Sequence, residues 1–117
     1  MGATMRLLIS LRAEKAAAYD LKYYHKLRGF LYGLQKNSDT FNRHGIDGYK
    51  LFSFSNIFPA KDMRYGDKRT LLIASPDKDF IIWLRGKLGE LHDNMKKINI
   101  GEMEFHIDGI KSLSPSL

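Results

Sequence analysis

Three side chains of kinds that transfer protons or stabilise phosphates lie in the first half of the chain: Tyr32, His44 and Lys50. Tyr32 falls within a helical pattern, and the residues seven and four positions before it, His25 and Arg28, are polar. Residues at these spacings share one side of a helix, so the Tyr32 phenol is expected on an exposed flank. His44 lies in a glycine-flanked loop, and Lys50 opens a strand. We therefore expect the three groups to converge at the end of the sheet where the helix ends.

A phenol, an imidazole and an ammonium together suit the cleavage of RNA without a metal ion. The ribose 2′-OH attacks the adjacent phosphate when a base removes its proton, and an acid protonates the departing 5′ oxygen. Histidine titrates near neutral pH and can act as either group. Tyrosine, with a reference pKa of about 10, needs a nearby cation to become a base, and lysine can supply that cation or stabilise the phosphorane. Each residue taken alone is more often an ordinary surface residue, so the pattern by itself leaves both interpretations open.

The sequence lacks the motifs of several other kinds of functional site. The chain has no cysteine, which excludes disulfides, cysteine nucleophiles and thiolate zinc sites. No two of its four histidines stand three or four residues apart, and Gly45 and Gly48 lack the Lys-Ser/Thr pair of a phosphate-binding loop. The expected third strand lacks the aromatic residues of an RNA-recognition motif. The sequence therefore predicts no metal site and no cofactor.

The composition is that of one globular domain: 117 residues, 44% of them hydrophobic and 27% charged. No apolar run approaches the ~18 residues of a membrane span, and no secretory signal is present, so we expect a cytoplasmic protein without a membrane partner. Nineteen Lys and Arg against 13 Asp and Glu give a net charge of +6, which favours nucleic acids because each neutralised phosphate releases a counterion. Residues 1–4 are expected to be a cloning remnant, residues 5–113 the domain, and residues 114–117 a linker or truncated end.

Alternating apolar residues predict strands over residues 5–11 and 102–108, and strands are also expected over residues 49–58 and 69–74. Residues 97–100 are expected to belong to the last strand's ladder, which a turn or a bulge at Gly101 interrupts.

Two helices separate these strands. The first is expected over residues 21–36, and the second begins at Pro76 with Ser75 as its N-cap. The order strand–helix–strand–strand–helix–strand predicts the α+β class and a ferredoxin-like βαββαβ fold, a four-stranded antiparallel sheet with both helices on one face. The residues expected to face the core are Tyr24, Leu27, Leu31 and Leu34 in the first helix and Ile81, Leu84, Leu88 and Leu91 in the second.

Three runs of residues carry a likeness to a known family. They are Leu27-Arg28-Gly29-Phe30-Leu31-Tyr32, Arg43-His44-Gly45 and Tyr49-Lys50-Leu51-Phe52-Ser53-Phe54-Ser55. They resemble the helix, the histidine loop and the strand of the CRISPR-associated endoribonucleases that cut repeat RNA, members of the repeat-associated mysterious protein superfamily. The resemblance covers residues 5–113, and the Lys-Leu-Phe-Ser-Phe-Ser segment is its most specific part.

This resemblance implies that Tyr32, His44 and Lys50 form the active centre of a metal-independent endoribonuclease acting on CRISPR repeat RNA, the precursor of guide RNA. The implied products are a 2′,3′-cyclic phosphate and a 5′-hydroxyl. Family members usually have two ferredoxin-like domains, and this chain resembles the N-terminal one. A second domain, a homodimer or a CRISPR effector complex are therefore the implied protein partners.

Positive charge in two loops predicts RNA contacts beside the proposed centre: Arg43 next to His44, and Lys61 and Arg64 in a basic loop over residues 60–67. One alternative function is a non-catalytic RNA-binding or assembly subunit of the same superfamily. Another is a regulatory domain that binds a small ligand, which would not need so basic a chain.

Overall fold

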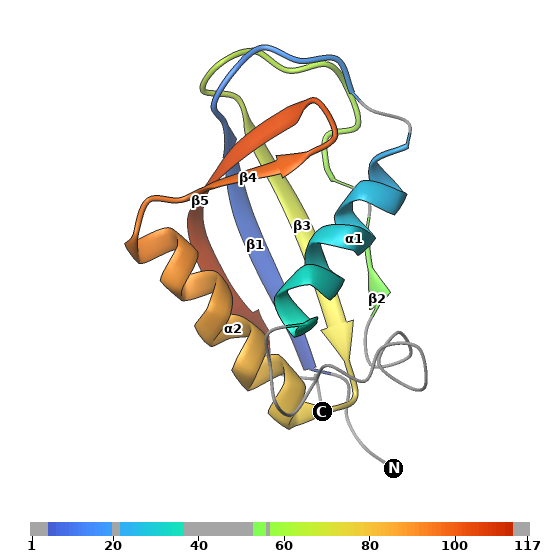
Figure 1. The fold of residues 1–117 in the computed structure, drawn as a ribbon, viewed down its shortest axis with the longest axis vertical. Helices are drawn as coiled ribbons and strands as arrows, with labels where there is room; N and C mark the ends of the chain where they lie inside the picture. Colours follow the sequence, from blue (N-terminus) through green and yellow to red (C-terminus); the bar gives the residue numbers. More distant parts are fainter. Residues whose placement is uncertain (1–4, 20–21, 37–52, 56, 114–117) are drawn as a thin grey trace.

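A computed structural model describes residues 5–19, 22–36, 53–55 and 57–113. Five strands and two helices lie in these residues (Figure 1). In chain order they are β1 (Met5–Ala13), α1 (Tyr23–Lys36), β2 (Ser53–Phe54), β3 (Lys68–Ser75), α2 (Lys78–Asp93), β4 (Lys97–Ile100) and β5 (Met103–Leu113). Neither of the described helices is long and apolar enough to cross a membrane.

The strands form one antiparallel sheet in the order β2-β3-β1-β5-β4. The central strand, β1, pairs with β3 on one side and with β5 on the other. Both helices cover the same face of the sheet (Figure 1). Because β3 lies between β1 and β2, and β1 lies between β3 and β5, the four strands β1, β2, β3 and β5 have the predicted ferredoxin-like arrangement. The predicted fold class is confirmed.

The sheet has a fifth strand that the four-stranded prediction lacked. β4 folds back onto β5 through a two-residue turn, with Ile100 opposite Met103. Gly101 begins this turn with a φ of 63°, a conformation that costs glycine little and that suits the glycine-first turns of hairpins. Of the two alternatives at Gly101, the turn is therefore correct, and residues 97–100 form an edge strand.

The last strand is longer than expected, since β5 continues to Leu113 rather than ending at Asp108. Its register against β1 shifts between Ser10 and Leu11, where Asp108 is the extra residue. A bulge of this kind bends a strand without ending its pairing. The alternating pattern breaks at the bulge, which explains why the sequence predicted an earlier end.

The second strand is described only in part. Ser53 and Phe54 pair with β3, and farther along Phe58 forms an isolated bridge to Thr70. The expected start of this strand, residues 49–52, lies outside the described residues.

Alternation along the strands builds the core under the helices. On β1, Leu7, Ile9 and Leu11 are buried, while the residues between them are partly exposed. The buried stripe predicted for α2 is confirmed for three residues, and the fourth, Leu91, is partly buried. Each large apolar side chain buried in this way contributes about 1.5–3 kcal/mol. The largest fully buried side chains are Phe80, Phe105, Leu7, Leu27, Leu31, Ile57, Ile73, Ile81, Leu84, Leu88, Ile100 and Met103.

The buried face of α1 begins one residue earlier than predicted. Tyr23 is 8% exposed, whereas Tyr24, which was predicted to face the core, is 49% exposed. The Tyr23 ring packs beside Tyr19, with 5.6 Å between the ring centroids. Tyr23, Leu27 and Leu31 are four residues apart and therefore lie on one side of the helix. Tyr24 is three residues before Leu27, and this spacing is equally compatible with the same side. The helical pattern alone therefore fits either tyrosine.

The N-terminus of α2 lies later than predicted. Its N-cap is Asp77 rather than Ser75, because an Asp77 carboxylate oxygen accepts a hydrogen bond from the Phe80 amide at 3.1 Å. Ser75 is the last residue of β3, is buried, and lies opposite Met5 of β1. Sheet pairing therefore holds Ser75 in extended conformation, and its hydroxyl accepts a hydrogen bond from the Asp77 amide instead.

We predict that Asp77→Ala lowers the free energy of unfolding by about 1 kcal/mol, the usual effect of losing an N-cap, because the Phe80 amide loses its acceptor. Urea denaturation measures the change. Asp79→Ala is the matched control, since it removes a carboxylate from the same helical turn that is not the cap, and it should cost less than about 0.5 kcal/mol. Equal losses for the two variants would show that Asp77 does not cap the helix.

Candidate functional site

The structure describes the residues of the predicted centre only in part. Tyr32 lies in α1, but its side chain is outside the described part of the structure, and Arg43, His44 and Lys50 lie outside the described residues. The convergence of the Tyr32 phenol, the His44 imidazole and the Lys50 ammonium therefore stays a prediction.

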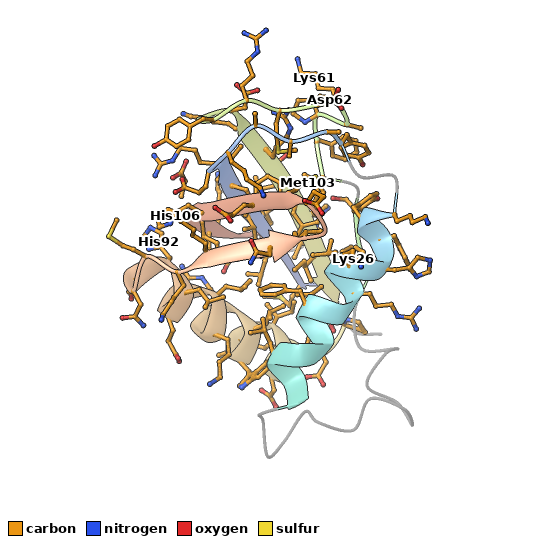
Figure 2. The ribbon with its side chains drawn as sticks, turned by 45° about the horizontal axis from the view of Figure 1, so that its top comes forward. Lys26, Lys61, Asp62, His92, Met103 and His106 are labelled. Carbon is orange, nitrogen blue, oxygen red and sulfur yellow. The ribbon has the colours of Figure 1, made fainter. Side chains whose placement is uncertain are left out.

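The direction of α1 nevertheless locates Tyr32 within the fold. The helix begins at Tyr23, near the loops at one end of the sheet, and runs toward the opposite end (Figure 1). Tyr32 is nine residues farther on, which corresponds to about 14 Å along the helix axis. Lys61 lies with its loop at the end where α1 begins (Figure 2). The structure therefore does not bring Lys61 and its loop next to the segment of α1 that carries Tyr32.

Two loops at this end of the sheet are joined by hydrogen bonds, and we call them the apical loops: residues 14–19, which follow β1, and residues 58–67, which precede β3. Ala17 and Met63 form a bridge, with N–O distances of 3.0 and 2.9 Å in the two directions. The Tyr19 amide donates to Asp62 Oδ1 at 2.8 Å. Since Met63 is buried, the loop that carries the predicted phosphate-binding cations is anchored to the body of the protein.

A tight turn closes the second apical loop. The Asp67 amide donates to the Arg64 carbonyl at 3.0 Å, and the Arg64 amide donates to Asp67 Oδ2 at 2.9 Å. Gly66, the third residue of the turn, has a φ of 88°. Turns with a positive φ at this position favour glycine. The turn is also docked on β1, because the Gly66 amide donates to the Ala13 carbonyl at 2.8 Å and the Ala13 amide donates to the Asp67 carbonyl at 2.8 Å.

Arg69 holds the same loop from inside. Arg69 is 3% exposed, and one terminal nitrogen, Nη2, donates to the carbonyls of Lys61 at 3.3 Å and Asp62 at 3.0 Å. The other, Nη1, donates to the Lys68 carbonyl at 2.7 Å, and the Asp67 carboxylate lies 4.0 Å from Nη2. The sequence analysis missed this residue. Its position in the strand could have predicted it: Arg69 alternates with the apolar residues Leu71 and Ile73, so its side chain is expected on the same, inward face.

The apical loops direct positive charge outward. Lys61 and Arg64 are exposed, and neither forms an ion pair with a carboxylate in the part of the chain that the structure describes. The two carboxylates of the second loop are hydrogen-bonded to backbone amides, Asp62 to Tyr19 and Asp67 to Arg64. The loop also forms an open hollow of about 550 Å³, which is lined by Lys61 and Arg64 together with Asp62, Met63 and Asp67. This surface can bind an anion without first breaking an ion pair between described residues.

Two other groups of titratable side chains lie outside this loop. Burial raises the pKa of the Tyr23 phenol above its usual value, and the neighbouring Tyr19 adds to the shift. The rings of His92 and His106 lie 6.4 Å apart, and His92 Nδ1 is 3.3 Å from Asp93 Oδ1 (Figure 2). Within the described ranges, no three histidine, aspartate or glutamate side chains are grouped so that they could hold a metal ion.

Comparison with known proteins relates this chain to a family of enzymes. No protein-family model matches it. It is 37% identical over 111 residues, 94% of its length, to the CRISPR-associated endoribonuclease Cas6 of Haloferax mediterranei. It is 33% identical over 107 residues, 92% of its length, to the CRISPR-associated endoribonuclease Cas6 2 of Methanocaldococcus jannaschii. Over more than nine-tenths of its own length, the chain is therefore similar to two Cas6 endoribonucleases.

The resemblance predicted from the sequence is thereby confirmed. The chain spans 39% and 43% of the two Cas6 relatives' own lengths. Among solved structures, a CRISPR-associated protein Cas6 matches 97% of this chain and 50% of its own, with a TM-score of 0.67 and 20% identity. A RAMP protein described as binding different RNA substrates matches 94% of this chain and 48% of its own, with a TM-score of 0.71 and 18% identity. These two similarities show the shared fold.

We predict that Arg69→Met lowers the free energy of unfolding by about 2–4 kcal/mol, because methionine preserves much of the buried stem but leaves the three carbonyls without their charged donor. Urea denaturation again provides the measurement. Arg85→Met is the control: Arg85 is exposed on α2, and its replacement should change the free energy by no more than about 0.5 kcal/mol. A similar, small effect for both variants would contradict the structural role given to Arg69.

Proposed function

We propose that the chain is the catalytic part of a metal-independent endoribonuclease that cleaves CRISPR repeat RNA. The observation that carries this proposal is the identity of 33–37% to two Cas6 endoribonucleases over more than nine-tenths of the chain. The net charge of +6 supports it, because a basic surface favours RNA. Since the chain spans about two-fifths of those relatives, a second domain, a second copy or a CRISPR effector complex completes the RNA-binding surface in this proposal. The cytoplasmic location also stays a prediction.

In the proposed reaction, the ribose 2′ oxygen forms a bond to the adjacent phosphorus, and the bond from phosphorus to the 5′ oxygen breaks. One proton leaves the 2′-OH and one is added to the 5′ oxygen, which gives a 2′,3′-cyclic phosphate and a 5′-hydroxyl. His44 and Tyr32 share these two proton transfers, and Lys50 stabilises the charge on the phosphorane. The roles follow from the chemistry of the three side chains and from the family resemblance.

The proposal separates the binding of RNA from its cleavage. Lys61 and Arg64 contact phosphates at the apical loops, while Arg43 contacts RNA beside His44. The exposure of the two apical cations, and the hydrogen bonds that hold their loop, support the first contact.

A non-catalytic RNA-binding subunit of the same superfamily is the second candidate. The observation that favours it is that Lys61 and its loop lie at the end of the sheet where α1 begins (Figure 2), away from the segment of α1 with Tyr32. A surface of this kind can hold RNA whether or not the chain cleaves it. Cleavage by the parental protein, tested below, distinguishes the two candidates.

We predict that Lys61→Gln and Arg64→Gln each reduce the slope of log affinity against log salt by about 0.7–1, because each variant loses one phosphate contact. The measurement is fluorescence anisotropy of labelled repeat RNA at several salt concentrations. Arg43→Gln should behave in the same way, and Arg85→Gln on α2 serves as the control that leaves the slope unchanged. If the Lys61, Arg64 and Arg43 variants all show the same salt slope as the parental chain, these residues do not form the RNA-binding surface.

Cleavage provides the test of the proposed centre. In a parental protein that cleaves repeat RNA, His44→Ala should slow single-turnover cleavage about 10²–10⁴-fold, the contribution of general acid–base catalysis. Tyr32→Phe should also reduce the rate, since it removes only the hydroxyl, and Lys50→Ala should reduce it through weaker transition-state stabilisation. Labelled RNA separated on a denaturing gel gives these rates.

Two controls define the chemistry. The parental rate should persist in EDTA, and its pH profile should have one limb that the His44 variant lacks. RNA affinity should survive both His44→Ala and Tyr32→Phe, because neither removes a positive charge when His44 is neutral. If His44→Ala cleaves at the parental rate, the catalytic assignment fails and the binding-subunit function replaces it.

A further inference from the structure

The turn of the second apical loop carries the most exposed aromatic side chain that the structure describes. Tyr65 is 74% exposed, although tyrosine has a large apolar ring that folding usually covers at least in part. It follows Arg64 and precedes Gly66, so it occupies the corner of the turn that Arg64 and Asp67 close. With about three-quarters of its surface exposed, Tyr65 is accessible to a ligand at this loop.

The backbone on both sides of Tyr65 is fixed. Before it, the Arg64 amide and carbonyl are both hydrogen-bonded to Asp67. After it, the Gly66 amide donates to the Ala13 carbonyl on β1. Since the turn is ordered in the folded protein, a ligand that stacks on the Tyr65 ring does not have to order the backbone first, and this lowers the entropic cost of binding.

The Tyr65 ring is accompanied by cations. Arg64 is its direct neighbour, Lys61 lines the same hollow as Arg64, and Lys68 follows at the start of β3; all three are exposed. An exposed aromatic ring beside cations is the combination with which proteins bind single-stranded nucleic acids: the cations track the phosphates, and the ring stacks on a base. A duplex would offer the phosphates but not the face of a base, because its bases are stacked on one another.

We propose that the second apical loop is a preformed site for single-stranded RNA, in which Tyr65 stacks on an unpaired base while Lys61 and Arg64 hold the flanking phosphates. This inference rests on the proposed RNA binding and adds to it a residue without charge. The site holds RNA at the end of the sheet where α1 begins, so the nucleotide on Tyr65 is not the one that reacts near Tyr32. Tyr65 is therefore a binding residue and not a catalytic one.

The test measures binding to this 117-residue chain by anisotropy, with a fluorescein-labelled oligouridylate of twelve nucleotides as the probe. Tyr65→Ala should raise the Kd about 5- to 150-fold, the range for the loss of one stacked base. The salt slope should stay at the parental value, because no charge is removed. Tyr65→Phe keeps the ring and should bind within about twofold of the parental chain. Ile82→Ala, which truncates an exposed apolar side chain on α2, is the control for an unspecific effect.

A ligand without bases separates stacking from a change in the loop. Inorganic polyphosphate offers only the negative charges, so the Tyr65→Ala variant should bind polyphosphate as tightly as the parental chain does. The Lys61→Gln variant should bind both polyphosphate and oligouridylate more weakly. Ultraviolet irradiation of oligouridylate that contains 5-iodouridine should attach the RNA to Tyr65, which mass spectrometry of the digested protein identifies.

The outcomes separate this inference from the proposed function. An unchanged Kd for Tyr65→Ala, together with a smaller slope for Lys61→Gln, would overturn the stacking site and leave the phosphate contacts in place. Equal losses for RNA and polyphosphate in Tyr65→Ala would also overturn it, since Tyr65 would then act through the shape of the loop. If the parental chain shows no salt-dependent binding of RNA, both the proposed RNA binding and the stacking site fail.

Discussion

The burial of the Arg69 guanidinium is the constraint on which the apical surface depends. A guanidinium carries five N–H donors, and a buried donor without an acceptor costs about 1–3 kcal/mol. Strand alternation directs this side chain to the core face of β3, where the carbonyls of Lys61, Asp62 and Lys68 accept its hydrogen bonds. These bonds satisfy the two terminal nitrogens and hold the loop over the guanidinium, while the buried Nε has no hydrogen-bond partner among the described residues. The exposed cations and the exposed tyrosine of this loop lie on a backbone that the buried Arg69 side chain helps to hold.

A series of contacts connects the second apical loop to α1. Asp62 accepts a hydrogen bond from the Tyr19 amide, and the Tyr19 ring packs beside Tyr23, the first residue of the helix. Tyr23, Leu27 and Leu31 then anchor one side of α1 on the sheet. A helix is stiff along its axis, so the segment that carries the predicted catalytic phenol is tied, through packed residues, to the loop that carries the cations. The loop that carries Lys61 and the segment of α1 that carries Tyr32 are in this way connected through packed residues.

The elements could be predicted wherever the sequence has one periodicity. The alternation in β1 and at the start of β5 leaves a single choice of buried face, and both strands were predicted. Tyr23 and Tyr24 fit the helical stripe equally well, and contacts distant from the pattern separate them: the buried Tyr23 packs beside Tyr19, and the exposed Tyr24 packs beside Phe54. The Ser75-Pro76 pair is a good local signal for a helix start, but pairing of Ser75 in the sheet overrides it. The prediction of Ser75 as the N-cap was wrong because Ser75 pairs with Met5, a residue distant in sequence that the local pattern does not reveal.

The candidate site could be predicted less completely, for a related reason. Lys61 and Arg64 are visible as charges in a loop, and the resemblance supplies Tyr32, but the partners that order the loop are backbone carbonyls, which residue types do not encode. Arg69 itself could have been noticed, because it has the same alternation as the buried Leu71 and Ile73. Its acceptors could not, since they depend on how the loop folds back over β3.

Separating the binding loop from the segment with Tyr32 has a consequence for catalysis in the proposed enzyme. Interactions with parts of a substrate that do not react can be used to hold the reacting group in place, and well-oriented reactants can gain several kcal/mol in this way. Phosphates and a base held at the apical loops leave the next nucleotides to extend along the protein toward Tyr32. Their orientation then depends on the stiffness of the path between, which α1 and its buried face supply. In the proposed enzyme, a charged loop at one end of a small domain could in this way contribute to the rate of a reaction near Tyr32.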